Sequence, residues 1–170
     1  KVTVITGAAS GIGKAAVYKC LHEGSVVVAC DIHAKKLSTL KQEINLDQER
    51  LTTYTMDVGK RDDVEELIAT VVQQYRRLDV LVNSAGITPR TLPSEADFEA
   101  RWDAVMKINA KGTFLMCHAA VEAMRQSGGG AIINIASIMS LVAYPTSLPF
   151  SDGFSPYPQS KGAVLQLTRD

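Results

Sequence analysis

Residues 6–13 read Thr-Gly-Ala-Ala-Ser-Gly-Ile-Gly and follow directly on the apolar run 2–5, Val-Thr-Val-Ile. An apolar run followed by a glycine-rich turn predicts a buried strand, a tight turn and then a helix whose first N–H groups point outward. Such N–H groups, at the positive end of a helix dipole, bind phosphate. The stretch therefore predicts a pyrophosphate-binding turn, although glycines at these positions also let a helix pack close to a sheet without any ligand.

The composition is that of an ordinary globular protein. Of the 170 residues, 46% are hydrophobic and 21% are charged, and 18 basic side chains balance 18 acidic ones. A net charge of zero gives no electrostatic argument for a nucleic-acid or anionic-membrane partner, and no apolar stretch approaches the ~20 residues of a membrane helix. Cys20, Cys30 and Cys117 form no Cys-x-x-Cys pair. They indicate reduced thiols and hence a cytoplasmic location.

Strand-like and helix-like segments alternate along the chain. Mostly continuous apolar runs, typical of a parallel sheet buried on both faces, predict strands over 2–6, 26–31, 51–56, 80–83 and 131–136. Helical patterns lie between them, over 12–23, 34–45, 62–75 and 99–126, the last with a bend near Asn109. Repeated strand–helix units predict right-handed crossovers and a doubly wound parallel sheet of the Rossmann type, an α/β fold of three layers. Since no linker or repeat divides the chain, residues 1–170 are expected to form a single domain.

Asp31 ends the second predicted strand, 18 residues after Gly13. About 20 residues is the spacing at which an acid accepts hydrogen bonds from a cofactor ribose. Because a carboxylate there repels a 2′-phosphate, Asp31 predicts NAD rather than NADP. The alternative is a solvated acid at a strand end, and Lys14 and the basic residues of 33–36 favour NADP, less strongly than Asp31 favours NAD.

Tyr157 and Lys161 are four residues apart, so on a helix they project from one face. A cation beside a phenol favours its ionised form, which suits a tyrosine that transfers a proton. Taken alone, such a pair is more often structural than catalytic.

Three motifs together resemble the short-chain dehydrogenase/reductase family: Thr-Gly-x-x-x-Gly-x-Gly at 6–13, Asn-Ser-Ala-Gly at 83–86 and Tyr-Pro-Gln-Ser-Lys at 157–161. The resemblance extends from residue 1 to residue 170. It implies an oxidoreductase with a nicotinamide cofactor, a small-molecule alcohol or ketone substrate, and assembly into a homodimer or homotetramer. It implies no metal.

The resemblance also assigns roles to the matching residues. Tyr157 is expected to donate and accept the proton, and Ser137 to hydrogen-bond the substrate oxygen. Lys161 is expected to hold the nicotinamide ribose and tune the tyrosine, and Asn109 to support a proton relay behind the lysine. The expected cofactor-binding residues are Gly7, Ser10, Gly11, Ile12, Gly13, Asp31, Asp57, Val58, Asn83, Ala85, Tyr157 and Lys161.

Among these, Asp57 and Val58 are expected to meet the adenine and Asn83 to steady the central strands. Each assignment has a structural alternative. Ser137 is compatible with an ordinary strand-end hydroxyl, Asn109 with a helix-bend residue and Asp57 with a helix cap.

The chain departs from the family pattern in two places. Nineteen residues separate Ser137 from Tyr157, more than is usual, and the aromatic and hydroxyl side chains of 144–156 suit either a neutral or hydroxylated substrate or a surface loop with no substrate role. Arg90 is compatible with a clamp for a substrate carboxylate and with a solvated side chain.

The second departure is at the end of the chain. The family continues after the last helix with two further strands, which are missing here. Because an apolar strand at 131–136 would form an open edge, we expect a longer chain whose remainder adds a parallel strand beside it.

The sequence thus predicts an NAD-dependent oxidoreductase that interconverts a secondary alcohol and a ketone. One alternative is a nucleotide-sugar epimerase or dehydratase of the same superfamily, whose glycine turn usually reads Gly-x-x-Gly-x-x-Gly, unlike Gly7, Gly11 and Gly13. The other is a non-catalytic dinucleotide-binding module that regulates a partner.

Overall fold

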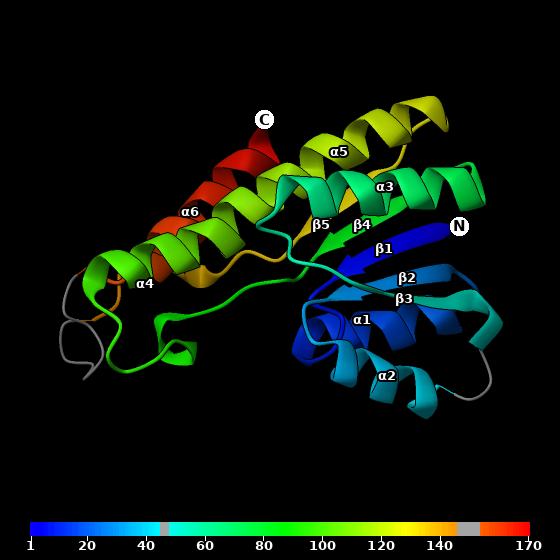
Figure 1. The fold of residues 1–170 in the computed structure, drawn as a ribbon. Helices are drawn as coiled ribbons and strands as arrows, with labels where there is room; N and C mark the ends of the chain where they lie inside the picture. The colour runs from blue at the N-terminus through cyan, green and yellow to red at the C-terminus, as the bar shows by residue number, and fades with distance from the viewer. Residues whose placement is uncertain (45–47, 146–153) are drawn as a thin grey trace.

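The computed structural model describes residues 1–44, 48–145 and 154–170, so most of the 144–156 segment lies outside the described residues. Its five strands form one parallel sheet in the order β3-β2-β1-β4-β5 (Figure 1). The strands are β1 (Val2–Thr6), β2 (Val26–Asp31), β3 (Leu51–Thr55), β4 (Val80–Asn83) and β5 (Ala131–Asn134). The chain therefore has the predicted Rossmann-like α/β fold.

Helices cover both faces of the sheet (Figure 1). One face carries α1 (Gly11–His22) and α2 (Ala34–Glu43). The other carries α3 (Arg61–Tyr75), α4 (Phe98–Val105), α5 (Thr113–Gln126) and α6 (Pro156–Arg169). Short helical turns η1 (Gln48–Arg50), η2 (Pro89–Thr91) and η4 (Ile138–Ser140) complete the connections.

The alternation of side chains along the strands produces one apolar core on each face of the sheet. Val4 and Val28 pack with the buried residues of α3 and α5, whereas Ile5 and Val27 pack with those of α1 and α2. Central strands are therefore buried on both faces, which explains why most of their residues are apolar. The outer strands are less buried, and Ile133 of β5 is 49% exposed.

The structure confirms every predicted strand and helix, with small differences at their ends. The strands predicted over 51–56 and 131–136 end at Thr55 and Asn134. The last predicted helix begins at Phe98, where Asp97 caps it by accepting a hydrogen bond from Ala100 N at 2.8 Å. The bend expected near Asn109 is a π-helical segment, η3 (Met106–Gly112), between α4 and α5.

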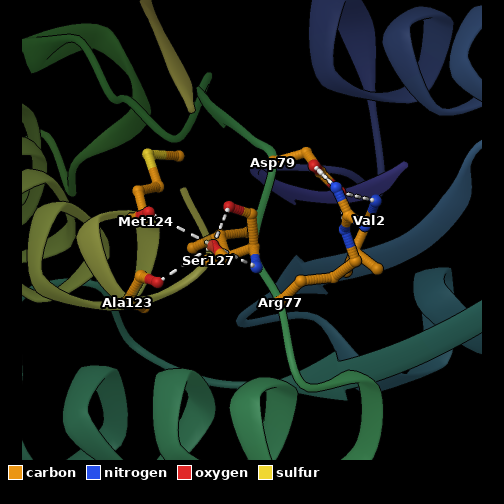
Figure 2. Close-up of polar contacts among 7 residues, drawn as sticks. Val2, Arg77, Asp79, Ala123, Met124 and Ser127 are labelled. Atoms are coloured by element: carbon orange, nitrogen blue, oxygen red, sulfur yellow. Dashed lines mark hydrogen bonds and ion pairs between the residues drawn. The ribbon is translucent and has the colours of Figure 1, made fainter. Parts of the chain in front are cut away.

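The amino end of the sheet is fastened by polar contacts (Figure 2). The Asp79 carboxylate, whose side chain is 12% exposed, accepts a hydrogen bond from Val2 N at 2.7 Å and pairs with Arg77. Ser127, which follows α5, places its Oγ 3.1 to 3.3 Å from the carbonyl oxygens of Leu78, Ala123 and Met124. These contacts join β1, β4 and α5 at the end of the sheet opposite the strands' carboxyl ends.

No helix within the described ranges is both long enough and apolar enough to cross a membrane.

Candidate functional site

A cleft of about 590 Å³ lies at the carboxyl ends of the strands. It opens beside β1, whose neighbours are β2 on one side and β4 on the other. In open α/β sheets this reversal of strand order leaves a crevice in which ligands bind. The walls include these predicted site residues: Gly7, Ser10, Gly11, Ile12, Asp31, Asp57, Val58, Ala85, Tyr157 and Lys161.

The glycine turn is shaped by close backbone approaches. Gly7 has a φ of +63°, and a Cβ atom on it would lie 2.8 Å from the backbone of Ala85. A Cβ atom on Gly13 would lie 2.2 Å from the carbonyl oxygen of Gly7. Gly13 is therefore needed for α1 to pack against the turn and does not itself line the cleft. Because the turn is this tight, α1 begins at the cleft wall, where the N–H groups of its first turn can bind an anion.

Asp31 is held at the lip of the cleft by two backbone groups. Its Oδ2 accepts a hydrogen bond from Ala9 N at 3.0 Å, and its Oδ1 accepts one from His33 N at 2.9 Å. Its side chain lies where β2 ends, and only 9% of the residue is exposed. The carboxylate thus has a fixed orientation between the glycine turn and the start of α2.

Lys14, the cation nearest the glycine turn in sequence, pairs with an acid on the neighbouring helix. Its Nζ lies 2.6 Å from Glu43 Oε2, and Tyr18 donates a hydrogen bond to the same oxygen. The hydrogen bond with Glu43 raises the pKa of the Lys14 ammonium. The charge of Lys14 is thereby balanced on the surface formed by α1 and α2.

Tyr157 and Lys161 project into the cleft from the first turns of α6, as their spacing predicted. Lys161 Nζ lies 5.9 Å from the centroid of the Tyr157 ring and donates a hydrogen bond to the carbonyl oxygen of Ile135 at 2.6 Å. The lysine is 6% exposed, and burial lowers the pKa of its ammonium group. A buried cation is thus fixed beside a phenol at the wall of the cleft.

Asn109 lies behind this pair and is fully buried in η3. Its Oδ1 accepts from Ile87 N at 2.8 Å, and its Nδ2 donates to Ile87 O at 2.9 Å and to Ser160 Oγ at 3.0 Å. Ser160 precedes Lys161 on α6. The amide therefore ties η3 to the loop after β4 and to the helix that carries Tyr157.

Two predicted site residues, Ser137 and Asn83, contact neighbouring elements and do not line the cleft. Ser137 caps η4, where its Oγ accepts from Met139 N at 3.2 Å. Asn83 ends β4, and its Nδ2 donates to Asn134 Oδ1 at 2.9 Å and to Cys117 Sγ at 3.3 Å. These contacts of Asn83 join β4, β5 and α5.

Asp57, another residue of the cleft wall, has a partner that could not be predicted from the sequence. Lys107 Nζ lies 3.1 Å from Asp57 Oδ2, and the two residues are 50 positions apart. Burial raises the pKa of the Asp57 carboxyl, but hydrogen bonds from Gly59 N and from Lys107 outweigh it, and the net shift is downward. No local pattern pairs such distant residues.

The cleft also contains residues that the sequence analysis did not predict to line it. They lie within or beside the recognised motifs and candidate residues: Cys30, Ile32, His33, Met56, Ser84, Gly86, Ile87, Thr88, Ile108, Ile135 and Ala136. That proximity was the signal that could have identified them. In the part of the chain that the structure describes, no group of three or more His, Cys, Asp or Glu side chains is placed to hold a metal ion.

Comparison with known proteins identifies the family of the chain. A sequence model of the short chain dehydrogenases matches residues 1–170. The chain belongs to the short-chain dehydrogenase/reductase family.

Members of the family with different substrates are similar to the chain. It is 38% identical over 169 residues to the 3-oxoacyl-[acyl-carrier-protein] reductase FabG of Thermotoga maritima, covering 99% of this chain and 65% of that protein. It is 39% identical over 177 residues to the 2-(R)-hydroxypropyl-CoM dehydrogenase of Xanthobacter autotrophicus, covering 99% and 66%. A solved structure described as ElxO with NADP bound superposes with a TM-score of 0.84 at 30% identity, covering 98% of this chain and 64% of that one. The chain thus spans just under two thirds of the length of these relatives.

Proposed function

We propose that this protein is an NAD-dependent oxidoreductase that interconverts a secondary alcohol and a ketone. The observation that carries the proposal is that one cleft holds both a glycine turn at a helix N-terminus and the buried Lys161 beside Tyr157. The first feature suits a dinucleotide and the second suits proton transfer. A module that only binds a dinucleotide has no use for the second.

The cleft fits a dinucleotide along its whole length. The N–H groups at the start of α1 would bind the pyrophosphate, and Asp31 would accept hydrogen bonds from the adenosine ribose. Asp57 and Val58 would meet the adenine, while Lys161 would hold the nicotinamide ribose. When bound, the nicotinamide supplies the carbon that accepts or donates hydride.

The chain's own residues would move the proton. Tyr157 would take the hydroxyl proton of the alcohol at its phenol oxygen, and return it to the ketone in the reverse direction. Lys161, a buried cation on the same face of α6, would lie beside the phenol during this transfer. Ser137 would orient the substrate oxygen, and Asn109 would hold η3 and α6 in register behind the lysine.

The choice of NAD over NADP rests on two observations. Asp31 presents a fixed carboxylate where a 2′-phosphate would lie, and two negative groups that close repel each other. Lys14, which would favour the phosphate, pairs with Glu43 at 2.6 Å. ElxO, with NADP bound, shows that this fold also accepts the phosphorylated cofactor, so the preference is a property of these residues.

We further propose that residues 1–170 form a single domain of a cytoplasmic homo-oligomer with a small-molecule substrate. All three cysteines are free, and Cys30 and Cys117 are buried, as expected in a reducing compartment. Phe114 on α5 is 51% exposed and Trp102 on α4 is 42% exposed, which suits burial against a second subunit.

The proposal is tested with the complete protein and a panel of sugars, polyols, steroids and hydroxy acids. Each compound is incubated with NAD and, separately, with NADP, and the reduced cofactor is followed by absorbance. We expect NADH formation with at least one secondary alcohol. Tight binding of NADH without turnover of any compound in either direction would favour the non-catalytic module instead.

A further inference from the structure

The Asp57 carboxylate is held from two directions. Asp57 Oδ1 accepts a hydrogen bond from Gly59 N at 2.8 Å, within its own turn. The backbone of Asp57 is also fixed locally, because its N–H donates to Asp63 Oδ2 at 2.9 Å and its carbonyl accepts from Lys60 N at 3.0 Å. Asp57 Oδ2 is different, because its partner Lys107 comes from η3.

Lys107 lies flat over the turn that carries Asp57. A Cβ atom on Gly59 would lie 2.6 Å from Lys107 Cε and 2.8 Å from Lys107 Cγ, so glycine at position 59 makes room for the lysine stem. The Lys107 side chain is 46% exposed and that of Asp57 is 12% exposed. The ion pair therefore sits at the rim of the cleft, with the carboxylate on the inner side.

The segment that carries Lys107 packs on the same turn a second time. A Cβ atom on Gly112 would lie 2.7 Å from Val58 Cγ2, and Ile108 lines the cleft beside Asp57 and Val58. The segment thus contacts the turn at two places, through the Lys107 side chain at Gly59 and through close packing of Gly112 on Val58.

We propose that Lys107 is a positioning residue that fixes the Asp57 carboxylate to accept a hydrogen bond from the 6-amino group of the cofactor's purine. The inference rests on the proposed function, which places the adenine against Asp57 and Val58. A carboxylate accepts hydrogen bonds and donates none. An adenine presents an amino donor at its 6-position and is accepted there. A 6-oxopurine presents an oxygen at that position and carries its donor on N1 instead, so a carboxylate fixed toward the 6-position binds it more weakly. Gly59 N binds Oδ1 and Lys107 Nζ binds Oδ2, so the carboxylate has one orientation in which to distinguish the two purines.

Discrimination between NADH and its hypoxanthine analogue tests the proposal. The affinity of the complete protein for each reduced dinucleotide is measured by fluorescence titration, which needs no substrate. We expect the wild type to bind NADH about tenfold more tightly than the analogue, as a site built for a donor rejects a ligand that lacks it. Lys107→Met should reduce this ratio of affinities to about threefold or less, chiefly because it binds NADH more weakly. Lys107→Arg should largely keep the ratio of the wild type.

Two further variants make the result specific. Lys111→Met removes an exposed lysine from the same segment and should leave the ratio unchanged. Asp57→Asn offers an amide that can donate to a 6-oxo group, and should move the ratio toward the hypoxanthine analogue even if Lys107→Met does not fold. Thermal melting establishes which variants are folded.

Three outcomes overturn the inference. If Lys107→Met weakens both dinucleotides equally, the lysine supports the turn but does not orient the carboxylate. If the wild type binds the two equally, Asp57 does not read the purine. If it binds neither, the placement of the cofactor fails, and the proposed function fails with it. A protein that discriminates as expected but turns over no alcohol would retain this inference and lose only the proposed reaction.

Discussion

At the scale of single residues, the proposed preference for NAD rests on Asp31, because backbone N–H groups hold both of its carboxylate oxygens. We expect kcat/KM to favour NAD over NADP by more than about tenfold, since a 2′-phosphate carries nearly two negative charges against a fixed carboxylate. Asp31→Ala should lower the ratio of kcat/KM with NAD to kcat/KM with NADP. Glu99 is an exposed acid on α4, and Glu99→Ala should leave this ratio unchanged. Steady-state kinetics with both cofactors measure this, and equal or better use of NADP by the wild type would refute it.

The second prediction at this scale concerns the close packing of Gly13 against the glycine turn. A methyl group at position 13 would lie 2.2 Å from Gly7 O, a contact that α1 can relieve only by moving away from the turn. Gly13→Ala should therefore lower the free energy of unfolding by about 3 kcal/mol or more, or prevent folding. Gly162→Ala on α6 is the matched control, because no atom lies within 4 Å of its added methyl group. It should be neutral or gain up to about 1 kcal/mol from helix propensity. Urea denaturation compares the two, and similar effects would contradict the packing argument.

Residues that act through local spacing were predictable from the sequence, and residues that act through distant partners were not. Tyr157 and Lys161 are four apart on a helix, so their common face followed from geometry alone. The pairing of Lys14 with Glu43 and of Lys107 with Asp57 depends on how helices and turns pack in three dimensions. From the sequence alone, Lys14 therefore counts in favour of NADP. In the structure its charge is paired with Glu43.

At the scale of elements, the amino end of β4 should respond to acid through Asp79. Its ion pair with Arg77 lowers the pKa of the Asp79 carboxyl, and the N–H of Val2 adds to the shift. Because the folded-state pKa lies below the unfolded value of about 3.9, the stabilisation is fully present above that value. It is lost as the pH falls through the lower, folded-state pKa.

Asp79→Asn should cost about 1 kcal/mol of the free energy of unfolding at pH 7, through loss of the charge-assisted bonds to Arg77 and Val2. The difference between wild type and variant should shrink below about pH 4. Asp103→Asn on α4 serves as the exposed control. Unfolding free energies measured from pH 7 down to pH 3 decide the matter, and a constant difference over that range would argue against the ion pair.

The element pattern was largely readable from the sequence, because strands buried on both faces are apolar throughout and the helices between them are amphipathic. The π-helical form of η3 was foreseen only as a bend near Asn109. The same apolar residues fit an α-helix, and no spacing in the sequence marks the wider turn of Met106–Gly112. Element ends shifted by one or two residues for similar reasons.

At the scale of the whole molecule, topology brings together groups that are far apart in sequence. The glycine turn follows β1, Asp31 ends β2, Asp57 follows β3 and Ala85 follows β4, so all lie at the same edge of the parallel sheet. Alternating strands and helices were sufficient to predict this convergence. The substrate side could not be predicted as far. Most of the 144–156 segment lies outside the described residues, and relatives of similar sequence act on different substrates.

The central claim is that the whole molecule couples hydride transfer to a proton moved by Tyr157. The most direct measurement compares turnover of one active alcohol by the wild type and by Tyr157→Phe at saturating NAD, with NADH affinity measured on both proteins. Phenylalanine keeps the ring and removes the proton. Turnover should therefore fall at least ~10²-fold while NADH binding changes little. Turnover within about tenfold of the wild type, or a parallel loss of NADH binding, would contradict the assignment of Tyr157 as the proton-transfer group.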